Sequence, residues 1–399
     1  MLIVIADDFS GAAEIGGIGY RYGLKAQVQL EFDPHSGADL IVINADTRSL
    51  TENEAIKKTE GLVNDLRNSG KRIAFKKVDS VFRGHIVEEI NVLQRQFKYK
   101  RVLLLPANPN RGRKIISGQY FVNGVSVDQT VFAKDPHFPT TSPSIEDVIN
   151  KNSSVLTHIH VTPHLPLTVS ALITGDVALK EDLECYIKHI GPDDLCCGAA
   201  ECFEAFLESK GFKVRKNEAS KGTSFQWPYF SLIISGSTVK DQIEKNEMAK
   251  HRLQNLSLPG KWRGDQFILE KEKEEHWQEE VSDLLSQYKV VAISIDHEVK
   301  QANAAAEMFS NHFTRLLHYI SEKHGRANIH FALTGGATAS TILKREGINS
   351  LDVKKEIAPG IVTLVNGQTS ELFTVKPGSY LWPASFIESL INKKNKSSE

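Results

Sequence analysis

The feature that most constrains the fold of this chain is the alternation of short apolar runs with amphipathic stretches along its first half. Runs rich in Val, Ile and Leu at Leu2–Ala6, Leu40–Asn44 and Val102–Pro106 have the length of buried strands. The stretches Glu52–Ser69 and Ile86–Phe97 have the length and periodicity of helices. Strands that alternate with such helices are typical of a mostly parallel sheet covered by helices. The sequence therefore predicts an α/β fold.

A polar stretch near the middle of the chain divides it. At 399 residues the chain is too long to fold around one hydrophobic core of ordinary size. Residues 211–226 (GFKVRKNEASKGTSFQ) show neither helical nor strand periodicity. A second alternation of strands and helices follows this stretch. We therefore expect two domains, each a mostly parallel sheet flanked by helices. Their expected limits are residues 1–210 and 229–391, with a linker over 211–228 and a frayed tail over 392–399.

The composition is that of an ordinary globular protein. It has 48 basic and 49 acidic residues, a formal net charge of -1 and 41% hydrophobic residues. This balance argues against nucleic acid or an anionic membrane as the main partner. No segment has the length of a signal peptide core or a membrane span, so a cytoplasmic location is expected. Neither a Cys-x-x-Cys pair nor a His cluster indicates a metal site, and structural thiols are expected at Cys185, Cys196, Cys197 and Cys202.

Two adjacent carboxylates end the first apolar run. Asp7 and Asp8 follow Leu2–Ala6, and Ser10 opens a helical stretch. Ligands of open α/β sheets bind just beyond the carboxyl ends of strands, and hydroxyl and N–H groups at a helix start favour anions. This turn predicts a site for a polar, charged small molecule. The alternative is a strand-to-helix turn capped by Ser10, with both acids in solvent.

A second charged segment follows another short strand. Lys76 and Lys77 precede Asp79 and Ser80, and Arg83 lies one turn further on. Arg offers a planar fork suited to a carboxylate or phosphate, and a carboxylate accepts hydrogen bonds from sugar hydroxyls. The segment is therefore a candidate substrate site. The alternative is an ordinary ion pair between the aspartate and the arginine.

Residues 108–143 break the alternation with many Pro, Gly and Asn residues, which predicts a long loop. Loops of this length in compact domains are usually functional. A basic patch at its start includes Arg113. The patch either closes over a ligand or is simply an exposed basic loop.

Three turns in the second half have the composition of phosphate-binding turns. Small residues and hydroxyls follow apolar runs at Ser235–Ser237 and Gly335–Thr338, and Gly378 follows a third run beside a lysine. Glycines let phosphate oxygens approach the backbone, where N–H groups and hydroxyls hold them. The alternative is tight turns that need glycine for conformational reasons. Neither a P-loop nor a strict Gly-x-Gly-x-x-Gly pattern occurs.

Together these segments identify a family resemblance. ADDFSGA at 6–12, KKVDSVFRG at 76–84, PANPNRGR at 106–113, GGAT at 335–338 and KPG at 376–378 occur in this order. In this order they resemble the motifs of the four-carbon acid sugar kinases, and the resemblance covers most of the chain. It implies a sugar-acid-binding domain first and an ATP-binding domain second, with the active site in the cleft between them.

The resemblance implies phosphorylation of the terminal hydroxyl of an acid such as threonate, erythronate or 3-oxo-tetronate. Sugar acid, ATP and Mg²⁺ are the partners expected, a homodimer is left open, and the sequence does not name the acid. Residues carried over to the substrate site are Asp7, Asp8, Asp79, Ser80 and Arg83, to which our reading of the segments adds Ser10, Lys76, Lys77 and Arg113. Residues carried over to the ATP site are Ser235, Gly236, Ser237, Gly335, Gly336, Ala337, Thr338 and Gly378.

A mechanism follows as a hypothesis. Arg83, helped by Lys76 or Lys77, holds the substrate carboxylate. Asp8 or Asp79 orients and deprotonates the terminal hydroxyl. Backbone N–H groups of the phosphate-binding turns hold the ATP phosphates with Mg²⁺.

Two other functions compete with this one. The family turn usually reads Gly-Gly-Asp-Thr, and Ala337 replaces its acid, while Val81 replaces a hydroxyl residue of the first domain. These changes favour a sensor of a sugar acid or nucleotide that transfers no phosphate. A phosphatase is the third alternative, but its chemistry needs Asp-x-Asp, whereas Asp7 and Asp8 are adjacent and face opposite ways on an extended strand.

Overall fold

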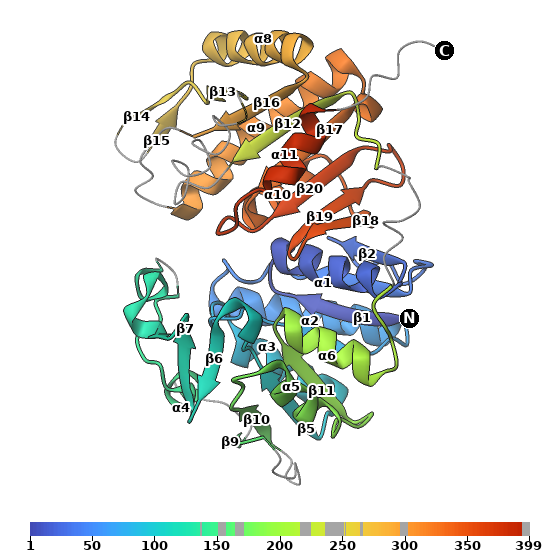
Figure 1. The fold of residues 1–399 in the computed structure, drawn as a ribbon, viewed down its shortest axis with the longest axis vertical. Helices are drawn as coiled ribbons and strands as arrows, with labels where there is room; N and C mark the ends of the chain where they lie inside the picture. Colours follow the sequence, from blue (N-terminus) through green and yellow to red (C-terminus); the bar gives the residue numbers. More distant parts are fainter. Residues whose placement is uncertain are drawn as a thin grey trace. The chain divides into compact units, whose positions relative to one another are not determined.

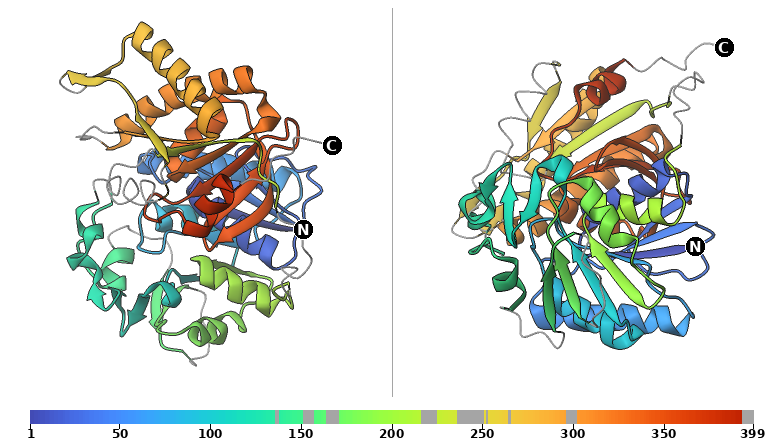
Figure 2. Two further views of the ribbon diagram at one scale, coloured as in Figure 1. Left: turned by 45° about the horizontal axis from the view of Figure 1, so that its top comes forward. Right: turned by 60° about the horizontal axis from the view of Figure 1, so that its bottom comes forward.

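The computed structural model describes residues 1–135, 138–150, 157–163, 171–215, 225–235, 251, 253–263, 266–295 and 302–392. The chain divides into two compact units, Met1–Arg215 and Lys216–Glu399, and each is described by itself. Figures 1 and 2 show that helices and strands alternate in both. Residues 216–224 of the expected linker and 393–399 of the expected tail lie outside the described residues.

The first unit is built on a parallel sheet. Its strand order is β2-β3-β1-β4-β11-β5-β10-β9, and every pairing in it is parallel. Val, Ile and Leu fill β1 and β3, whose middle residues are buried on both faces, as a parallel sheet between helices requires. The strands are β1 (Leu2–Ala6), β2 (Ala26–Gln29), β3 (Leu40–Asn44), β4 (Phe75–Lys77), β5 (Arg101–Leu105), β9 (His158–Val161), β10 (Leu172–Gly175) and β11 (Asp194–Gly198).

Helices cover both faces of this sheet. On one face α1 packs against α6, which packs against α5, and on the other α2 packs against α3. Close approach of α1 to β3 requires a glycine, since a Cβ on Gly19 would lie 2.2 Å from Leu40. The helices are α1 (Phe9–Arg21), α2 (Glu52–Asn68), α3 (Ile86–Phe97), α4 (Ile145–Asn150), α5 (Lys180–Ile187) and α6 (Ala200–Ser209).

The segment predicted as a long loop contains regular structure. Strands β6 (Arg113–Ile116), β7 (Gln119–Val122) and β8 (Val125–Ser126) form a small antiparallel sheet, which we call the β6–β8 arm. Figure 1 shows it in cyan beside the parallel sheet. The glycines that suggested a loop form its turns, since Gly118 and Gly124 have φ of 70° and 80°. These strands are too short to be seen as periodic runs in the sequence.

The second unit also has a mostly parallel sheet, in the order β13-β16-β12-β17-β20-β19-β18. The pairings are parallel from β13 to β20, and β19 and β18 join antiparallel. The expected α/β class with mostly parallel sheets is thus confirmed. The strands are β12 (Phe230–Ser235), β13 (Gln254–Ser257), β16 (Val290–Ser294), β17 (Ile329–Thr334), β18 (Ser350–Ala358), β19 (Ile361–Val365) and β20 (Leu372–Lys376), with a separate hairpin of β14 (Lys261–Arg263) and β15 (Gln266–Ile268).

The helices of the second unit include two long ones that pack against each other, α8 and α9. One core cluster joins the sheet to the last helix through Ile233, Ala332 and Phe386. Among the helices described in this chain, none is long and apolar enough to cross a membrane. The helices of this unit are α8 (Lys271–Tyr288), α9 (Ala302–His324), α10 (Gly336–Arg345) and α11 (Ala384–Ile391).

A buried ion pair lies behind β4. Lys76 Nζ is 2.5 Å from Glu89 Oε2 of α3, and both side chains are 1% exposed. The hydroxyl of Thr47 donates to the other oxygen of Glu89 at 2.7 Å. Successive strand residues face opposite sides of a sheet, so Lys77 points instead toward α1, where it is 3.6 Å from Glu14. The two adjacent lysines are therefore separated by the sheet.

We expect Lys76→Met to lower the free energy of unfolding by about 3–5 kcal/mol, because it leaves the Glu89 carboxylate buried without its partner. The double variant Lys76→Met, Glu89→Met should recover most of this loss, because it removes both charges. Urea unfolding followed by circular dichroism measures both. A double variant no more stable than the single one would show that the loss does not come from the unpaired charge.

Candidate functional site

The candidate site of the first unit lies at the carboxyl edge of its sheet. Asp7 and Asp8 follow β1, Arg48 follows β3, and Asp79 follows β4. Because β3, β1 and β4 are neighbouring parallel strands, the segments that follow them meet at one edge. The topology thus brings together residues that are more than seventy positions apart in the sequence. We call Asp7, Asp8 and Asp79 the aspartate cluster.

One arginine holds all three aspartates. Arg48 Nε and Nη2 lie 2.7 and 2.9 Å from the two oxygens of Asp7. Its Nη1 and Nη2 each lie 3.0 Å from an oxygen of Asp8, and Nη1 is 3.7 Å from Asp79 Oδ2. The side chain of Asp7 is 2% exposed, that of Asp79 is 7% and that of Asp8 is 16%. Asp8 is therefore the member of the cluster most open to a ligand.

Two members of the cluster, Asp8 and Asp79, are held in their ionised form. Burial opposes ionisation of Asp8, but Arg48 and the hydroxyl of Ser10 outweigh it and lower the pKa of Asp8. Burial likewise opposes ionisation of Asp79, but Arg83 and Arg48 hold its pKa well below the usual value. Arg48 in turn, although buried, has its pKa raised well above its usual value by Asp7 and Asp8. Asp8 and Asp79 are thus carboxylates at neutral pH.

The start of α1 differs from the alternative in which Ser10 caps it. Asp8 is the N-cap residue and accepts from Gly11 N at 2.9 Å, while the Ser10 hydroxyl donates to Asp8 Oδ2 at 2.5 Å. The alternative weighed from the sequence, a cap by Ser10 with both acids in solvent, is therefore not what the structure has: Asp8, two residues earlier, is the cap. Glycine suits this position, since a Cβ on Gly11 would lie 2.7 Å from Asp8 Oδ1.

The turn after β4 folds around Asp79. Its Oδ1 accepts from the backbone N–H groups of Val81 and Arg83 at 3.0 and 3.2 Å. Its Oδ2 is 2.8 Å from Arg83 Nη2, so the ion pair weighed from the sequence is present. Phe82 adopts the left-handed region with a φ of 62° inside this turn. Arg83 Nη1 also lies 3.6 Å from Oδ2 of Asp135, a residue that follows the β6–β8 arm in the sequence.

The β6–β8 arm meets this turn at Ser80. Arg113 Nη1 donates to the Ser80 hydroxyl, and the Tyr120 hydroxyl donates to the Ser80 carbonyl oxygen. The ring of Phe132 lies 5.8 Å from the guanidinium carbon of Arg83 and 5.6 Å from that of Arg113. The arm therefore adds an arginine to the edge of the cluster, and the segment that follows the arm in the sequence adds an aromatic ring.

The loop that carries Arg113 is tied to α6. Asn110 N donates to Glu201 Oε1 at 2.9 Å. Burial raises the pKa of Glu201 to about 7, although the Asn110 N–H and Arg111 oppose the shift. Glu201 lies inside the amphipathic pattern of α6, so no sequence pattern singles out this acid.

The structure brings most of the predicted substrate residues together and separates one. Lys76 lies on the opposite face of the sheet with Glu89, and so does not join the cluster. Lys77 is buried beside Glu14 and donates to the Val78 carbonyl oxygen at 3.0 Å. Phe132 and Asp135 belong to a segment over 124–136 that continues the family resemblance, although the sequence assigns them no role. Sequence reasoning missed Arg48 and Tyr120, of which Arg48 had a usable signal, its place just after a buried strand.

In the second unit three parallel strands end side by side. Ser235 of β12 is in register with Thr334 of β17, which is in register with Lys376 of β20. The Thr334 hydroxyl is buried and has no hydrogen-bond partner within the described residues. Lys376 is fully buried, and its ammonium donates to the Tyr380 carbonyl oxygen at 2.7 Å.

The turn after β17 leads directly into α10. Gly335 has a φ of 98° and precedes the helix without a side-chain cap, and its N–H donates to the Lys376 carbonyl oxygen at 2.9 Å. Ala337 is exposed on the first helical turn, whereas Thr338 is buried. Gly378 is half-buried after β20. Gly236 and Ser237, also predicted for this site, lie outside the described residues.

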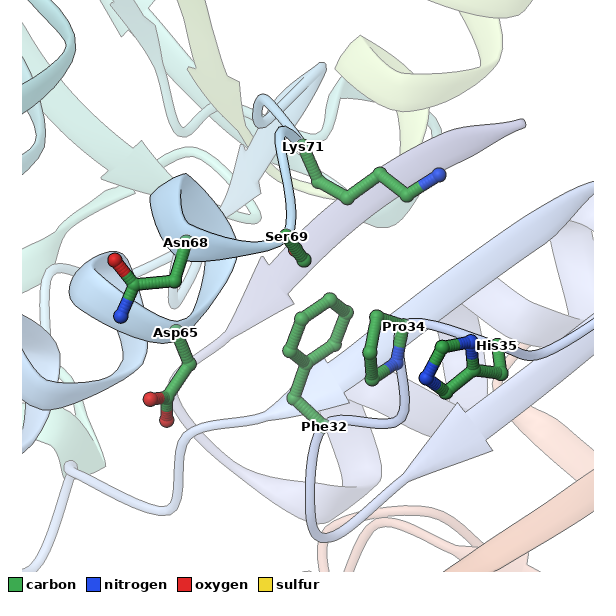
Figure 3. Close-up of a pocket in the computed structure, with 7 residues that line it drawn as sticks. All are labelled: Phe32, Pro34, His35, Asp65, Asn68, Ser69 and Lys71. Atoms are coloured by element: carbon green, nitrogen blue, oxygen red, sulfur yellow. The ribbon is translucent and has the colours of Figure 1, made fainter.

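A surface cavity of about 630 Å³ in the first unit contains none of the predicted residues. Figure 3 shows its lining on the loop after β2 and at the end of α2. Within the described ranges, no group of three or more His, Cys, Asp or Glu side chains is arranged to hold a metal ion. The cavity is lined by Phe32, Pro34, His35, Asp65, Asn68, Ser69 and Lys71.

Comparisons with known proteins agree with the motifs. Residues 2–188 match the family model described as a sugar-binding N-terminal domain. A D-threonate kinase of Salmonella typhimurium is 32% identical over 157 residues, which are 39% of this chain and 37% of that protein. A 3-oxo-tetronate kinase of Haemophilus influenzae is 25% identical over 413 residues, covering 95% of this chain and 97% of that protein.

A solved structure agrees with the fold. The crystal structure of a Salmonella typhimurium LT2 protein described as a tRNA synthase superposes with a TM-score of 0.77. It covers 97% of this chain and 98% of that one at 18% sequence identity, so the likeness concerns the fold alone. The resemblance drawn from the motifs is confirmed by the relatives in sequence. Residues 2–188, just under half of the chain, therefore match the model of sugar-binding N-terminal domains, and the chain is similar to proteins named D-threonate kinase and 3-oxo-tetronate kinase.

Proposed function

We propose that this protein is an ATP-dependent kinase that phosphorylates the terminal hydroxyl of a four-carbon sugar acid of the threonate, erythronate or 3-oxo-tetronate type. The observation that carries the proposal is the partly exposed, ionised carboxylate of Asp8 at an arginine-rich sheet edge. The relatives named as D-threonate kinase and 3-oxo-tetronate kinase support the same substrate class.

Asp8 is the group proposed to receive the proton of the acceptor hydroxyl. The oxygens of both Asp8 and Asp79 accept hydrogen bonds within the protein, but the side chain of Asp8 is 16% exposed, against 7% for Asp79 and 2% for Asp7. Asp8 has a lowered pKa and is thus a weak base, but phosphoryl transfer through a loose transition state depends mainly on position and on charge neutralisation. Its main task is to orient the hydroxyl toward the γ-phosphate. Asp79 is proposed to hold Arg83 in place.

The carboxyl edge of the second sheet is proposed to bind the ATP phosphates. The start of α10 has no side-chain cap, so its first N–H groups are suited to an anion. The Thr334 hydroxyl immediately before the turn has no hydrogen-bond partner among the described residues and is a further donor, because burying a hydroxyl without a partner is costly. Ser235, Gly335, Gly336, Ala337, Thr338 and Gly378 form the described part of this proposed site, and Gly236 and Ser237 belong to the same proposal.

Mg²⁺ enters the proposal only as the counter-ion that ATP usually carries. Mg²⁺ in kinase sites is held by one or two carboxylates together with substrate phosphates and water. Ala337 supplies no carboxylate to the turn before α10, and Arg48 already occupies the carboxylates of Asp7 and Asp8. The described residues thus do not form a Mg²⁺ site of their own, and no step of the transfer is derived through the ion.

A second candidate is a sensor that binds a sugar acid or nucleotide without transferring phosphate. The exposed methyl group of Ala337, where the family turn usually has an acid, is the observation in its favour. A phosphatase is disfavoured, because Arg48 engages the carboxylates of both Asp7 and Asp8.

The proposed activity is tested by ATP-to-ADP turnover with Mg²⁺ over a panel of four-carbon sugar acids, with an acid-free control. Asp8→Asn should lower the rate about 10²- to 10⁴-fold, because the hydroxyl loses its proton acceptor. Asn caps helices about as well as Asp, so the start of α1 should persist. ATP affinity, measured by calorimetry, should change little.

Turnover that depends on one acid would support the kinase and identify its substrate. Near-normal turnover by Asp8→Asn would remove Asp8 from the proposed role. ATP binding without turnover on any acid would favour the sensor.

Arg48 should set the pH profile of the reaction. In the wild type, Asp8 contributes no acid limb to kcat/KM above about pH 5, since its pKa lies below its usual value. Arg48→Lys replaces the planar guanidinium with a single ammonium group, which forms fewer hydrogen bonds to Asp8. The effect of burial on Asp8 is then less fully offset, and the pKa of Asp8 rises. The protonated fraction of Asp8 then grows at higher pH, and the acid limb should move upward.

The measurement is kcat/KM for the sugar acid from about pH 5 to 8 at saturating ATP. Arg101→Lys is a matched control, because Arg101 forms a comparable pair with Asp194 at the other end of the sheet, with Nε 2.9 Å from Oδ1. Superimposable profiles for the wild type and Arg48→Lys would contradict this role of Arg48.

Thr334→Val tests the nucleotide site. Removal of this buried hydroxyl, which no described residue hydrogen-bonds, should leave the melting temperature of the free protein unchanged or slightly higher. The Kd for ATP should rise about 5- to 30-fold as one phosphate donor is lost. The control Thr363→Val breaks a 2.9 Å hydrogen bond to Thr374. It should lower the melting temperature without lowering the affinity for ATP. Unchanged ATP affinity in Thr334→Val would exclude a contact between this hydroxyl and the phosphates.

A further inference from the structure

Three arginines surround the turn from Asp79 to Arg83, and their partners differ. Arg48 is bound by the aspartate cluster, with Asp7 and Asp8 each within 3.0 Å. Arg83 lies 2.8 Å from Asp79 and 3.6 Å from Asp135. Two of the three guanidinium groups are thus paired with carboxylates of the protein itself.

Arg113 is the exception. Its Nη1 donates to the neutral Ser80 hydroxyl, and its guanidinium carbon lies 5.6 Å from the centre of the Phe132 ring. In the part of the chain that the structure describes, no carboxylate lies within ion-pair distance of it. A guanidinium has five N–H donors in a planar fork, and one hydroxyl occupies only one of them. The remaining donors of Arg113 match the geometry of a carboxylate.

The position of Arg113 is fixed before any ligand arrives. Its backbone N–H and carbonyl oxygen pair with Asn108 at 3.1 and 2.8 Å, and it begins strand β6. Ser80, which its side chain contacts, is 6% exposed and also accepts from Tyr120. The side chain is therefore held against the turn on one side and against an aromatic ring on the other. A side chain held in this way loses little conformational entropy on binding.

We infer that Arg113 binds the carboxylate of the substrate and so makes the enzyme select sugar acids over their neutral analogues. The inference rests on the proposed function and deepens it. It replaces the expectation that Arg83 with Lys76 or Lys77 holds this group. The charge of Arg83 is already paired with Asp79, Lys76 faces the other side of the sheet, and Lys77 is buried beside Glu14.

The assignment also determines which end of the substrate lies at the β6–β8 arm and which lies at the start of α1. Arg113 contacts Ser80, the residue next to Asp79, and Asp79 is joined through Arg48 to Asp8. The substrate carboxylate is then at the β6–β8 arm, and its terminal hydroxyl is at the start of α1. The carboxylate is remote from the reacting oxygen, so Arg113 binds ground state and transition state alike.

The experiment compares each four-carbon acid with its neutral amide in the wild type and in Arg113→Gln. For the acid, kcat/KM should fall about 10- to 100-fold in Arg113→Gln, mainly through KM. For the amide it should stay the same or rise, so that the preference for the acid disappears. Arg113→Lys keeps the charge without the fork and should give an intermediate preference.

Lys114→Gln is the matched control, because it removes one positive charge from the next residue of β6, which faces the other side of the strand. It should keep the wild-type preference for the acid. Circular dichroism and calorimetric ATP binding show whether each variant is folded. A purely structural role of Arg113 would lower acid and amide turnover equally.

Retention of the acid preference by Arg113→Gln would overturn the inference. Should the wild type turn over no acid, the proposed function fails, and calorimetric titration with the acids decides the inference separately. Acid binding that disappears in Arg113→Gln would then support it. Acid binding that persists in this variant, or a wild type that binds no four-carbon acid, would overturn it.

Discussion

The contact between Arg48 and the aspartate cluster is the interaction on which the first unit's candidate site depends. Three carboxylates at one sheet edge repel one another, and burial opposes the ionisation of Asp8 and Asp79. One guanidinium, with donors on three nitrogens, offsets both effects. It also ties the segments after β1, β3 and β4 to each other, so that sheet topology and site geometry are fixed together. Loss of this arginine would leave buried, uncompensated charge rather than only a missing contact.

The two units use the same topological position for different chemistry. In each, neighbouring parallel strands end at one edge, where ligands of open α/β sheets bind. In the first unit that edge carries aspartates and arginines, which suit a polar acceptor with hydroxyl and carboxylate groups. In the second, the edge carries the small residues Ser235, Thr334 and Gly335 beside the buried ammonium of Lys376, and the helix that follows has no side-chain cap. Such an edge can approach a polyanion closely with backbone N–H groups.

Sequence patterns predicted what depends on local chemistry, and missed what depends on pairing across the sheet. The strand before Asp7 and the turn around Asp79 follow from apolar runs that end in polar residues. Arg48 was missed because nothing near it in the sequence tells that β3 lies beside β1. Lys76 was grouped with Lys77 by adjacency, although successive strand residues face opposite sides. The β6–β8 arm was predicted as a loop, because its strands have two to four residues and its turns contain the glycines.

The charge state of the cluster bears on the kind of reaction it can assist. A group that accepts a proton in one step and returns it in the next works best with a pKa near the working pH. Asp8 and Asp79 are held below their usual pKa values by arginines, and so are poor at returning protons near neutral pH. Hydrolysis by a phosphatase needs an acid that protonates the leaving group, and Asp8 and Asp79, with their lowered pKa values, are unsuited to that role. Transfer of a phosphoryl group to a hydroxyl needs a fixed negative partner for one proton and fixed positive charges for the acid substrate, and this edge supplies both.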